Sequence, residues 1–412
     1  MVTMKTSFFS VIVLIGLPAV LFPACSWCAA SAENNKLREQ VLRDFLALSD
    51  LAAEALIQEP ADNSNYSGSL RAYPQFFVDS YAVRALAVAY DLTGRKRYLE
   101  ACQVWSDRML EYQKGMIPEG AYYMNYHRKP GENTGEWFVA DCGSIVMGVL
   151  ATALRCDDPP LRKKYLESSE SFARLVLTNY ARPSGGITDG LWHISDKEWW
   201  CSTALFSAFA FQYYGITGKT EYFNVAQAGV DWLFNFDYDR TILYGFEKGA
   251  PTTIFYILEA YASALPHIKS GTPRREEIIK RLSASVEWMA DTQNSSGTWD
   301  YNPDNWGVKL GGLPCHMLIY LEYSGEDPNS RLYRLSPAGR LVLFPDLVRR
   351  SAGKALNYFS SGDAARRKSF SQQDAFTIMS YAERLCPGEL YSKTNSAFPY
   401  RRLTEEELDR IK

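Results

Sequence analysis

The fold is decided by the stretch Tyr81-Ala-Val-Arg-Ala-Leu-Ala-Val-Ala-Tyr90, which leads into the turn Thr93-Gly94-Arg95-Lys96-Arg97-Tyr98. The first part is apolar nearly all round, as is typical of a helix inside a larger assembly. The turn places Gly94 at the helix end, where glycine adopts a left-handed conformation that other residues resist. An amphipathic segment follows over about 96–113. The stretch therefore predicts an apolar helix, a short turn and an amphipathic helix.

This unit recurs six times, about every sixty residues, and such periodicity indicates a repeat architecture. Thr217-Gly218-Lys219-Thr220-Glu221-Tyr222 repeats the turn, and Asp157-Asp158-Pro159-Pro160 makes the same turn with proline at a helix start. The apolar helices are expected to begin near Tyr73, Trp137, Glu198, Thr252, Gly311 and Ser371. The expected inner helices cover 74–92, 137–155, 198–215, 252–269, 312–324 and 370–386, and the outer ones 37–58, 96–113, 160–180, 220–236, 274–293 and 338–360.

Short turns make consecutive helices antiparallel neighbours, so each apolar helix pairs with an amphipathic one. The sequence thus predicts an all-α (α/α)6 toroid of about twelve helices, in which the first helix pairs with the last to close the ring. No linker or composition shift divides the chain, so residues 33–412 are expected to form one domain. The net charge is −3 and no basic stripe is present, which argues against nucleic acid as the main partner.

Residues 1–32 have the features of a secretory signal peptide. Lys5 supplies a positive charge, residues 8–22 form a short apolar region, and Ala30-Ser31-Ala32 is a small-residue cleavage site. The protein is therefore expected to be exported to the periplasm or the extracellular space. The alternative is a lipoprotein anchored through Cys25. No later segment has the composition of a membrane span.

Six cysteines follow the predicted cleavage site: Cys102, Cys142, Cys156, Cys201, Cys315 and Cys386. Three of them, Cys142, Cys201 and Cys315, recur near the starts of apolar helices. A small buried residue suits such a crowded position in the ring. A disulfide between neighbouring helices is the alternative. A metal site that combines cysteines with His316 is disfavoured because these six cysteines and the histidines show no CxxC or HxxxH spacing, so neither metal nor cofactor is predicted.

The long connections all lead from an outer helix to the next inner one, so they are expected at one mouth of the ring. These loops are rich in Trp, Tyr, Gly and carboxylates. Flat rings beside polar groups suit a sugar chain, although each Trp could instead pin a loop by packing. The predicted substrate-binding residues are Tyr126, His127, Arg128, Trp137, Asp189, Trp192, His193, Trp199, Trp200, Lys248, Trp299 and Trp306.

Two carboxylates interrupt apolar helices near their starts, namely Asp79 and Asp141. A carboxylate there can simply complement the helix dipole. In a confined cavity, however, burial raises a carboxyl pKa and makes a usable general acid. Asp141 is the first candidate for catalysis, and Asp79 and Glu136 are further candidates.

The motifs around Asp141 resemble those of six-hairpin glycosidases, especially the unsaturated glucuronyl and rhamnogalacturonyl hydrolases. The similar stretches are Trp137-Phe-Val-Ala-Asp141-Cys-Gly-Ser-Ile-Val-Met147-Gly-Val-Leu150-Ala151, Gly190-Leu191-Trp192-His193 and Glu198-Trp199-Trp200. The resemblance implies that Asp141 protonates the double bond of an unsaturated uronic sugar, to which water then adds. It also implies that His193, Arg128 or Lys248 holds the uronate carboxylate.

Other functions remain open from the sequence. An ordinary inverting glycosidase would pair Asp141 with Asp79, Glu136 or Asp189, spaced for a water. A polysaccharide lyase acting on uronans would use the Tyr, His and Asn of Asn125-Tyr126-His127. A non-catalytic ring would keep the aromatic residues for glycan binding.

Overall fold

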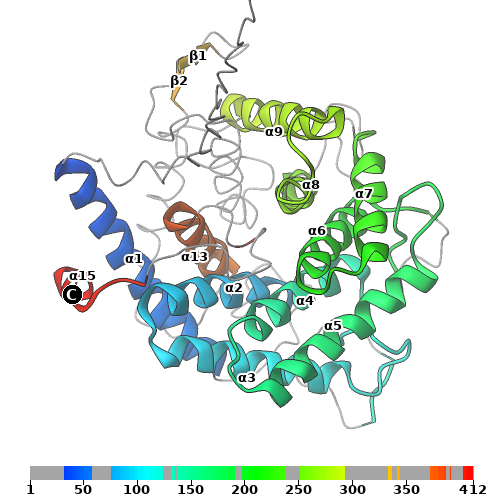
Figure 1. The fold of residues 1–412 in the computed structure, drawn as a ribbon, viewed down its shortest axis with the longest axis horizontal. Helices are drawn as coiled ribbons and strands as arrows, with labels where there is room; N and C mark the ends of the chain where they lie inside the picture. The colour runs from blue at the N-terminus through cyan, green and yellow to red at the C-terminus, as the bar shows by residue number, and fades with distance from the viewer. Residues whose placement is uncertain are drawn as a thin grey trace, which may run out of the picture.

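The structure is a computed structural model that describes residues 32–57, 76–123, 131–134, 137–190, 197–236, 251–292, 333–335, 341–343, 372–386, 390 and 402–411. Its helices are arranged in a ring with two concentric layers, an inner and an outer one (Figure 1). The inner layer contains α2 (Phe76–Thr93), α4 (Val139–Ala153), α6 (Trp200–Thr217), α8 (Pro251–Ala264) and α13 (Gln372–Leu385). The outer layer contains α1 (Ala32–Ile57), α3 (Lys96–Gln113), α5 (Pro159–Asn179), α7 (Thr220–Leu233) and α9 (Pro273–Thr292). This arrangement confirms the predicted toroid.

Neighbouring inner helices run parallel. Near their starts, α2 and α4 are joined by Tyr81 and Ser144, whose hydroxyl oxygens lie 3.3 Å apart. At their ends the Asp91 carboxylate pairs with Arg155 at 2.7 Å. Because contacts match start to start and end to end, these helices begin at the same face of the ring.

The same order continues around the ring. The pair α6 and α8 is joined near its start by Cys201 and Thr253, and further along by Gln212, which donates to Ser263 at 3.1 Å. Helix α13 packs against both α2 and α1. The first helix therefore pairs with the last of the inner helices, as the sequence predicts.

The repeated turns have nearly the same geometry. Gly94 and Gly218 adopt φ values of 69° and 68°, and the amide of each donates to a carbonyl of the preceding turn at 2.7 Å. In both turns the threonine before the glycine donates its hydroxyl to the carbonyl four residues earlier and accepts from the amide two residues later. The predicted glycine-ended turns are therefore confirmed at both positions.

Tyrosines join successive outer helices through carboxylates. Tyr98 of α3 donates to Asp50 of α1 at 2.7 Å. Tyr165 of α5 donates to Asp107 of α3 at 2.8 Å. Tyr222 of α7 donates to Glu170 of α5 at 2.9 Å. Because two of these tyrosines come from the repeated turns, the turn also fixes how consecutive hairpins pack.

One predicted helix is wrong in part. Residues 338–360 were expected to be helical, but Leu341–Leu343 forms strand β2, which pairs antiparallel with β1 (Tyr333–Leu335). Gly339 and Pro345 closely flank β2, and a proline cannot lie inside a regular helix. The predicted helix over 312–324 and residues 1–31 of the predicted signal peptide (1–32) lie outside the described residues. In the part of the chain that is described, no helix has the length and apolar character needed to cross a membrane.

The described cysteines are buried free thiols, namely Cys102, Cys142, Cys156, Cys201 and Cys386. Cys315 lies outside the described residues. The prediction of small buried residues in a crowded ring is therefore confirmed for Cys142 and Cys201, and the disulfide alternative is not found among these five.

His267, just after α8, gives a prediction for the pH dependence of stability. Its ring stacks on Phe211 with centroids 5.9 Å apart, and burial lowers its pKa from 6.5 to about 4. The unfolded chain then binds a proton that the folded chain does not, so this residue's contribution is present above pH 6.5 and is lost as the pH falls toward 4. We expect His267→Phe to remove on the order of 3 kcal/mol of acid destabilisation over that window. Urea unfolding at several pH values measures it, and an unchanged pH slope in the variant would contradict it.

Candidate active site at the start of the inner helices

Asp141 lies in the first turn of α4 and is half-buried. A second carboxylate is held beside this turn: the carbonyl of Asp189 accepts from the amide of Val139 at 3.0 Å. Asp189 is itself only 4% exposed, and its Oδ1 accepts from the hydroxyl of Ser202 in the first turn of α6. Burial raises the pKa of the Cys142 thiol, and the negative charges of Asp141 and Asp189 raise it further. The structure thus brings two of the predicted carboxylates to one place.

The segment 187–190 connects the starts of α4 and α6. On one side Gly190 pairs with Phe138 in an antiparallel bridge, and on the other Thr188 pairs with Glu198. The amide of Ile187 also donates to the hydroxyl of Thr203 at 2.8 Å. Because backbone bonds hold both sides of this segment, Asp189 has a fixed position relative to both helices.

Trp137 packs against the segment 187–190. Its side chain is 1% exposed and packs edge-on against Tyr180, with ring centroids 5.4 Å apart. Gly190 lies so close that a Cβ there would meet the Trp137 ring at 2.7 Å. The burial of Trp137 fits the alternative in which this Trp pins a loop, and its predicted role in sugar stacking stays a prediction.

Gly190 gives a test of this packing. Its φ of 95° is unfavourable for other residues, and a methyl group would collide with Trp137. We expect Gly190→Ala to lower the free energy of unfolding by roughly 2–4 kcal/mol, since backbone strain and overpacking each cost about 1–3. Gly218→Ala is the control, because its φ of 68° is the left-handed helical region and no atom lies within 4 Å of a Cβ there. Equal losses in the two variants, measured by urea unfolding, would contradict the packing argument.

The two tryptophans at the start of α6 differ in their surroundings. Trp200 packs against Trp232 and Phe236, with ring centroids 4.2 and 5.1 Å away. Trp199 is half-buried, and the ammonium group of Lys197 lies 5.5 Å from the centre of its ring. Trp200 is therefore part of an aromatic cluster that holds α6 to α7, while Trp199 is the partly accessible ring beside Asp189's segment.

Asp79 lies in the first turn of α2 and is 2% exposed. A helix turns 100° per residue, so Asp79 is about 200° around α2 from Tyr81, which faces the ring interior. One turn beyond Asp79 on the same face, the carbonyl of Val83 accepts from the Cys102 thiol of α3 at 3.4 Å. The structure therefore places Asp79 on the side of α2 that faces the outer layer. Its catalytic role stays a prediction.

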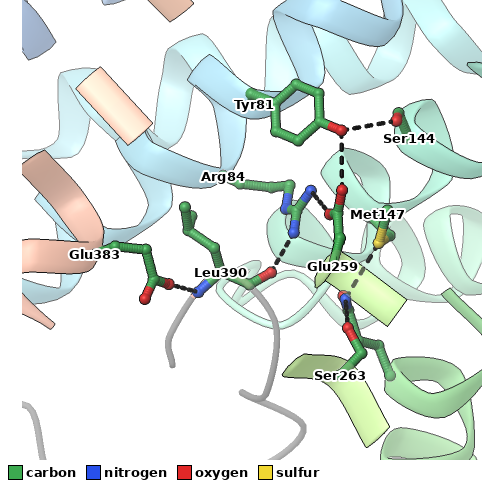
Figure 2. A network of polar contacts seen from close by, with 9 residues as sticks. Tyr81, Arg84, Ser144, Met147, Glu259, Ser263, Glu383 and Leu390 are labelled. Atoms are coloured by element: carbon green, nitrogen blue, oxygen red, sulfur yellow. Dashed lines mark hydrogen bonds and ion pairs between the residues drawn. The ribbon is translucent and has the colours of Figure 1, made fainter. Parts of the chain in front are cut away.

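A buried polar network lies in the ring interior (Figure 2). Tyr81 of α2 and Glu259 of α8 each lie one to two turns after the start of their helix. Glu259 of α8 accepts from the Tyr81 hydroxyl at 2.9 Å and pairs with the Arg84 guanidinium at 2.7 Å. Helices α4 and α6 lie between α2 and α8 around the ring, so these bonds cross its interior. Burial and then the Glu259 charge raise the pKa of Tyr81 well above its usual range, so its hydroxyl keeps its proton.

Sequence reasoning missed this network. The signal was Arg84 inside the otherwise apolar run 81–90 and Glu259 inside the apolar helix over 252–269. A charged residue is almost never fully buried unless it is paired, so each charge indicates a partner. The pairing itself could not be predicted, because it joins helices that are not neighbours in the ring.

The remaining predicted site residues lie outside the described part of the chain: Glu136, Tyr126, His127, Arg128, Trp192, His193, Lys248, Trp299 and Trp306. Among the residues that the structure describes, no group of three or more His, Cys, Asp or Glu could hold a metal ion.

No protein-family model and no curated protein matches this sequence. Solved structures do match. An unsaturated glucuronyl hydrolase from Bacillus sp. GL1 is 13% identical, with a TM-score of 0.57 over 86% of this chain and 100% of that one. A family 76 glycoside hydrolase (mannosidase) from Bacteroides thetaiotaomicron is 10% identical, with a TM-score of 0.56 over 83% and 98%.

A polysaccharide lyase also matches, at 13% identity and a TM-score of 0.50 over 83% of this chain and 97% of that one. At such low identity these likenesses show the fold alone. The predicted resemblance to six-hairpin glycosidases is therefore confirmed as a resemblance of fold: this chain has the (α/α)6 toroid that those enzymes share.

Proposed function

We propose that this protein is a carbohydrate-active enzyme, a glycoside hydrolase that acts on unsaturated or other uronic-acid-containing oligosaccharides, with Asp141 as the general acid. The observation that carries the proposal is the pair of carboxylates at the start of α4. Asp141 is half-buried, and Asp189 is buried and fixed by Ser202. A general acid must be able to contact a ligand, and the half-buried Asp141 is accessible enough to do so.

The two carboxylates suit different roles. For an unsaturated uronic sugar, Asp141 would donate a proton to the double bond, and a water molecule would add to the cation that forms. Asp189, held in place by backbone and side-chain bonds, would orient that water. In an ordinary inverting hydrolysis, the same pair would divide the work of acid and base across the scissile bond.

The comparisons support a carbohydrate substrate without choosing among the chemistries. The similar structures include a glucuronyl hydrolase, a mannosidase and a lyase, and one fold often hosts several activities. The choice of hydrolase rests on Asp141 and its sequence surroundings, Trp137 to Ala151. Export is part of the proposal and rests on the predicted signal sequence of residues 1–32.

An absorbance assay tests this function. The purified chain is incubated separately with unsaturated uronic oligosaccharides and with intact uronans. A hydrolase of the proposed kind removes the ultraviolet absorbance of the conjugated double bond from the oligosaccharides. New absorbance from intact uronans would overturn the proposal in favour of a lyase. Binding of both substrates without any change in absorbance or in product size would overturn it in favour of a glycan-binding ring.

A further inference from the structure

The buried network in the ring interior is more polar than packing requires. Tyr81, Arg84 and Glu259 are 0%, 2% and 0% exposed. An apolar trio of similar volume would fill the same space, and replacing a buried ion pair by well-packed apolar residues is often neutral or stabilising. The network therefore calls for a role other than stability.

The network is held at both of its ends. Arg84 donates a second bond to the carbonyl of Leu390, and the amide of Leu390 donates to Glu383 of α13 at 3.0 Å (Figure 2). At the other end, the Tyr81 hydroxyl lies 3.3 Å from the hydroxyl of Ser144 in α4. The polar contacts thus run from α13 through α2 and α8 to α4.

Ser144 brings the network to the candidate site. It follows Asp141 by three residues, so the two lie one turn apart on nearly the same face of α4. Tyr81 is also fixed by the edge of Phe255 in α8, at a centroid distance of 5.7 Å. Tyr81 is therefore held between α8 and the second turn of α4.

We propose that Glu259 is a positioning residue for Asp141. Its two carboxylate oxygens bind Tyr81 and Arg84 of the opposite helix. These bonds set the distance between α2 and α8 across the ring, and with it the position of α4 relative to both helices. This inference rests on the proposed function, because it names Asp141 as the residue that is positioned. Glu259 is fully buried and bonds to Tyr81 and Arg84, so it acts on Asp141 only through other residues.

The kinetic test uses Glu259→Gln and Tyr81→Phe on unsaturated uronic oligosaccharides. Tyr81→Phe keeps the ring and removes only the hydroxyl, so it remains informative if Glu259→Gln does not fold. We expect kcat to fall by about tenfold or more while KM stays within about threefold, because positioning acts on the transition state and not on binding. Glu170→Gln is the matched control: it removes a glutamate of the outer helix α5 that also accepts tyrosine hydroxyls, from Tyr213 of α6 and Tyr222 of α7. Folded variants with the kcat of the wild type would overturn the proposal.

A second measurement does not depend on activity. Hydrogen exchange followed by mass spectrometry reports on peptides that cover 137–146, where the Cys142 amide donates to Phe138 at 2.9 Å. We expect faster exchange there in Tyr81→Phe than in Glu170→Gln at matched global stability. Unchanged exchange would overturn the positioning role. If the wild-type chain turns over no glycan but exchange at 137–146 does respond, the proposed function fails while the link from the network to α4 stands.

Discussion

Asp141→Asn is expected to lower kcat on unsaturated uronic oligosaccharides by about 10²–10⁴-fold, the usual contribution of a general acid. The amide has nearly the same size as the carboxyl group but cannot donate a proton at neutral pH. Asp141 is half-buried in the first turn of α4, so the substitution leaves the helix packing intact. The loss of absorbance of the double bond, followed at saturating substrate, measures the effect directly.

Asp157→Asn is the control for this experiment. Asp157 is an exposed aspartate just beyond the other end of α4, so the same chemical change is made far from the candidate site. It should retain wild-type kcat and KM. Wild-type turnover in Asp141→Asn, with the fold verified by circular dichroism, would remove Asp141 from the mechanism.

The second large effect is on stability. We expect Arg84→Met to lower the free energy of unfolding by about 3–5 kcal/mol, because it leaves the Glu259 carboxylate buried without its ion-pair partner. The double variant Arg84→Met, Glu259→Met removes both charges and keeps most of the volume. It should recover most of that loss, since no buried charge remains uncompensated. Urea unfolding of the wild type, the single variant and the double variant gives the three free energies.

The control is an ion pair of the same kind at the surface. Arg274 of α9 pairs with Asp231 of α7 at 2.7 Å, and the two side chains are 34% and 43% exposed. Solvent screens such a pair, so Arg274→Met should cost about 0–1 kcal/mol. An equal loss in the single and double variants at Arg84 would mean that packing volume, and not charge pairing, accounts for the effect.

The architecture could be predicted because its determinants are local and repeated. The glycine-ended turns at Gly94 and Gly218 and the proline start at Pro159 each act within a few residues. Apolar runs such as 81–90 then identify the inner layer. The prediction was wrong over 341–343, where an apolar run too short to define a helical period forms a strand.

The candidate site could be predicted only in part. The sequence pointed to Asp141 and Asp189 separately, from a helix start and from a loop. It could not show that the segment 187–190 bonds to both helix starts, which is what places the two carboxylates together. Nor could it show that Asp79, so similar in its sequence setting, lies on the side of α2 that faces the outer layer. A difference of one or two positions along a helix decides that side, while helix ends read from sequence are uncertain by as much.

By itself, therefore, the sequence determined the repeat, the two layers of helices and the type of residue at the start of each inner helix. These follow from local propensity and from hydrophobic periodicity, which depend on near neighbours in the chain. Only the tertiary structure decided which polar groups meet. Glu259 lies 175 residues from Arg84 and on the far side of the ring, so only closure of the toroid brings the two charges together.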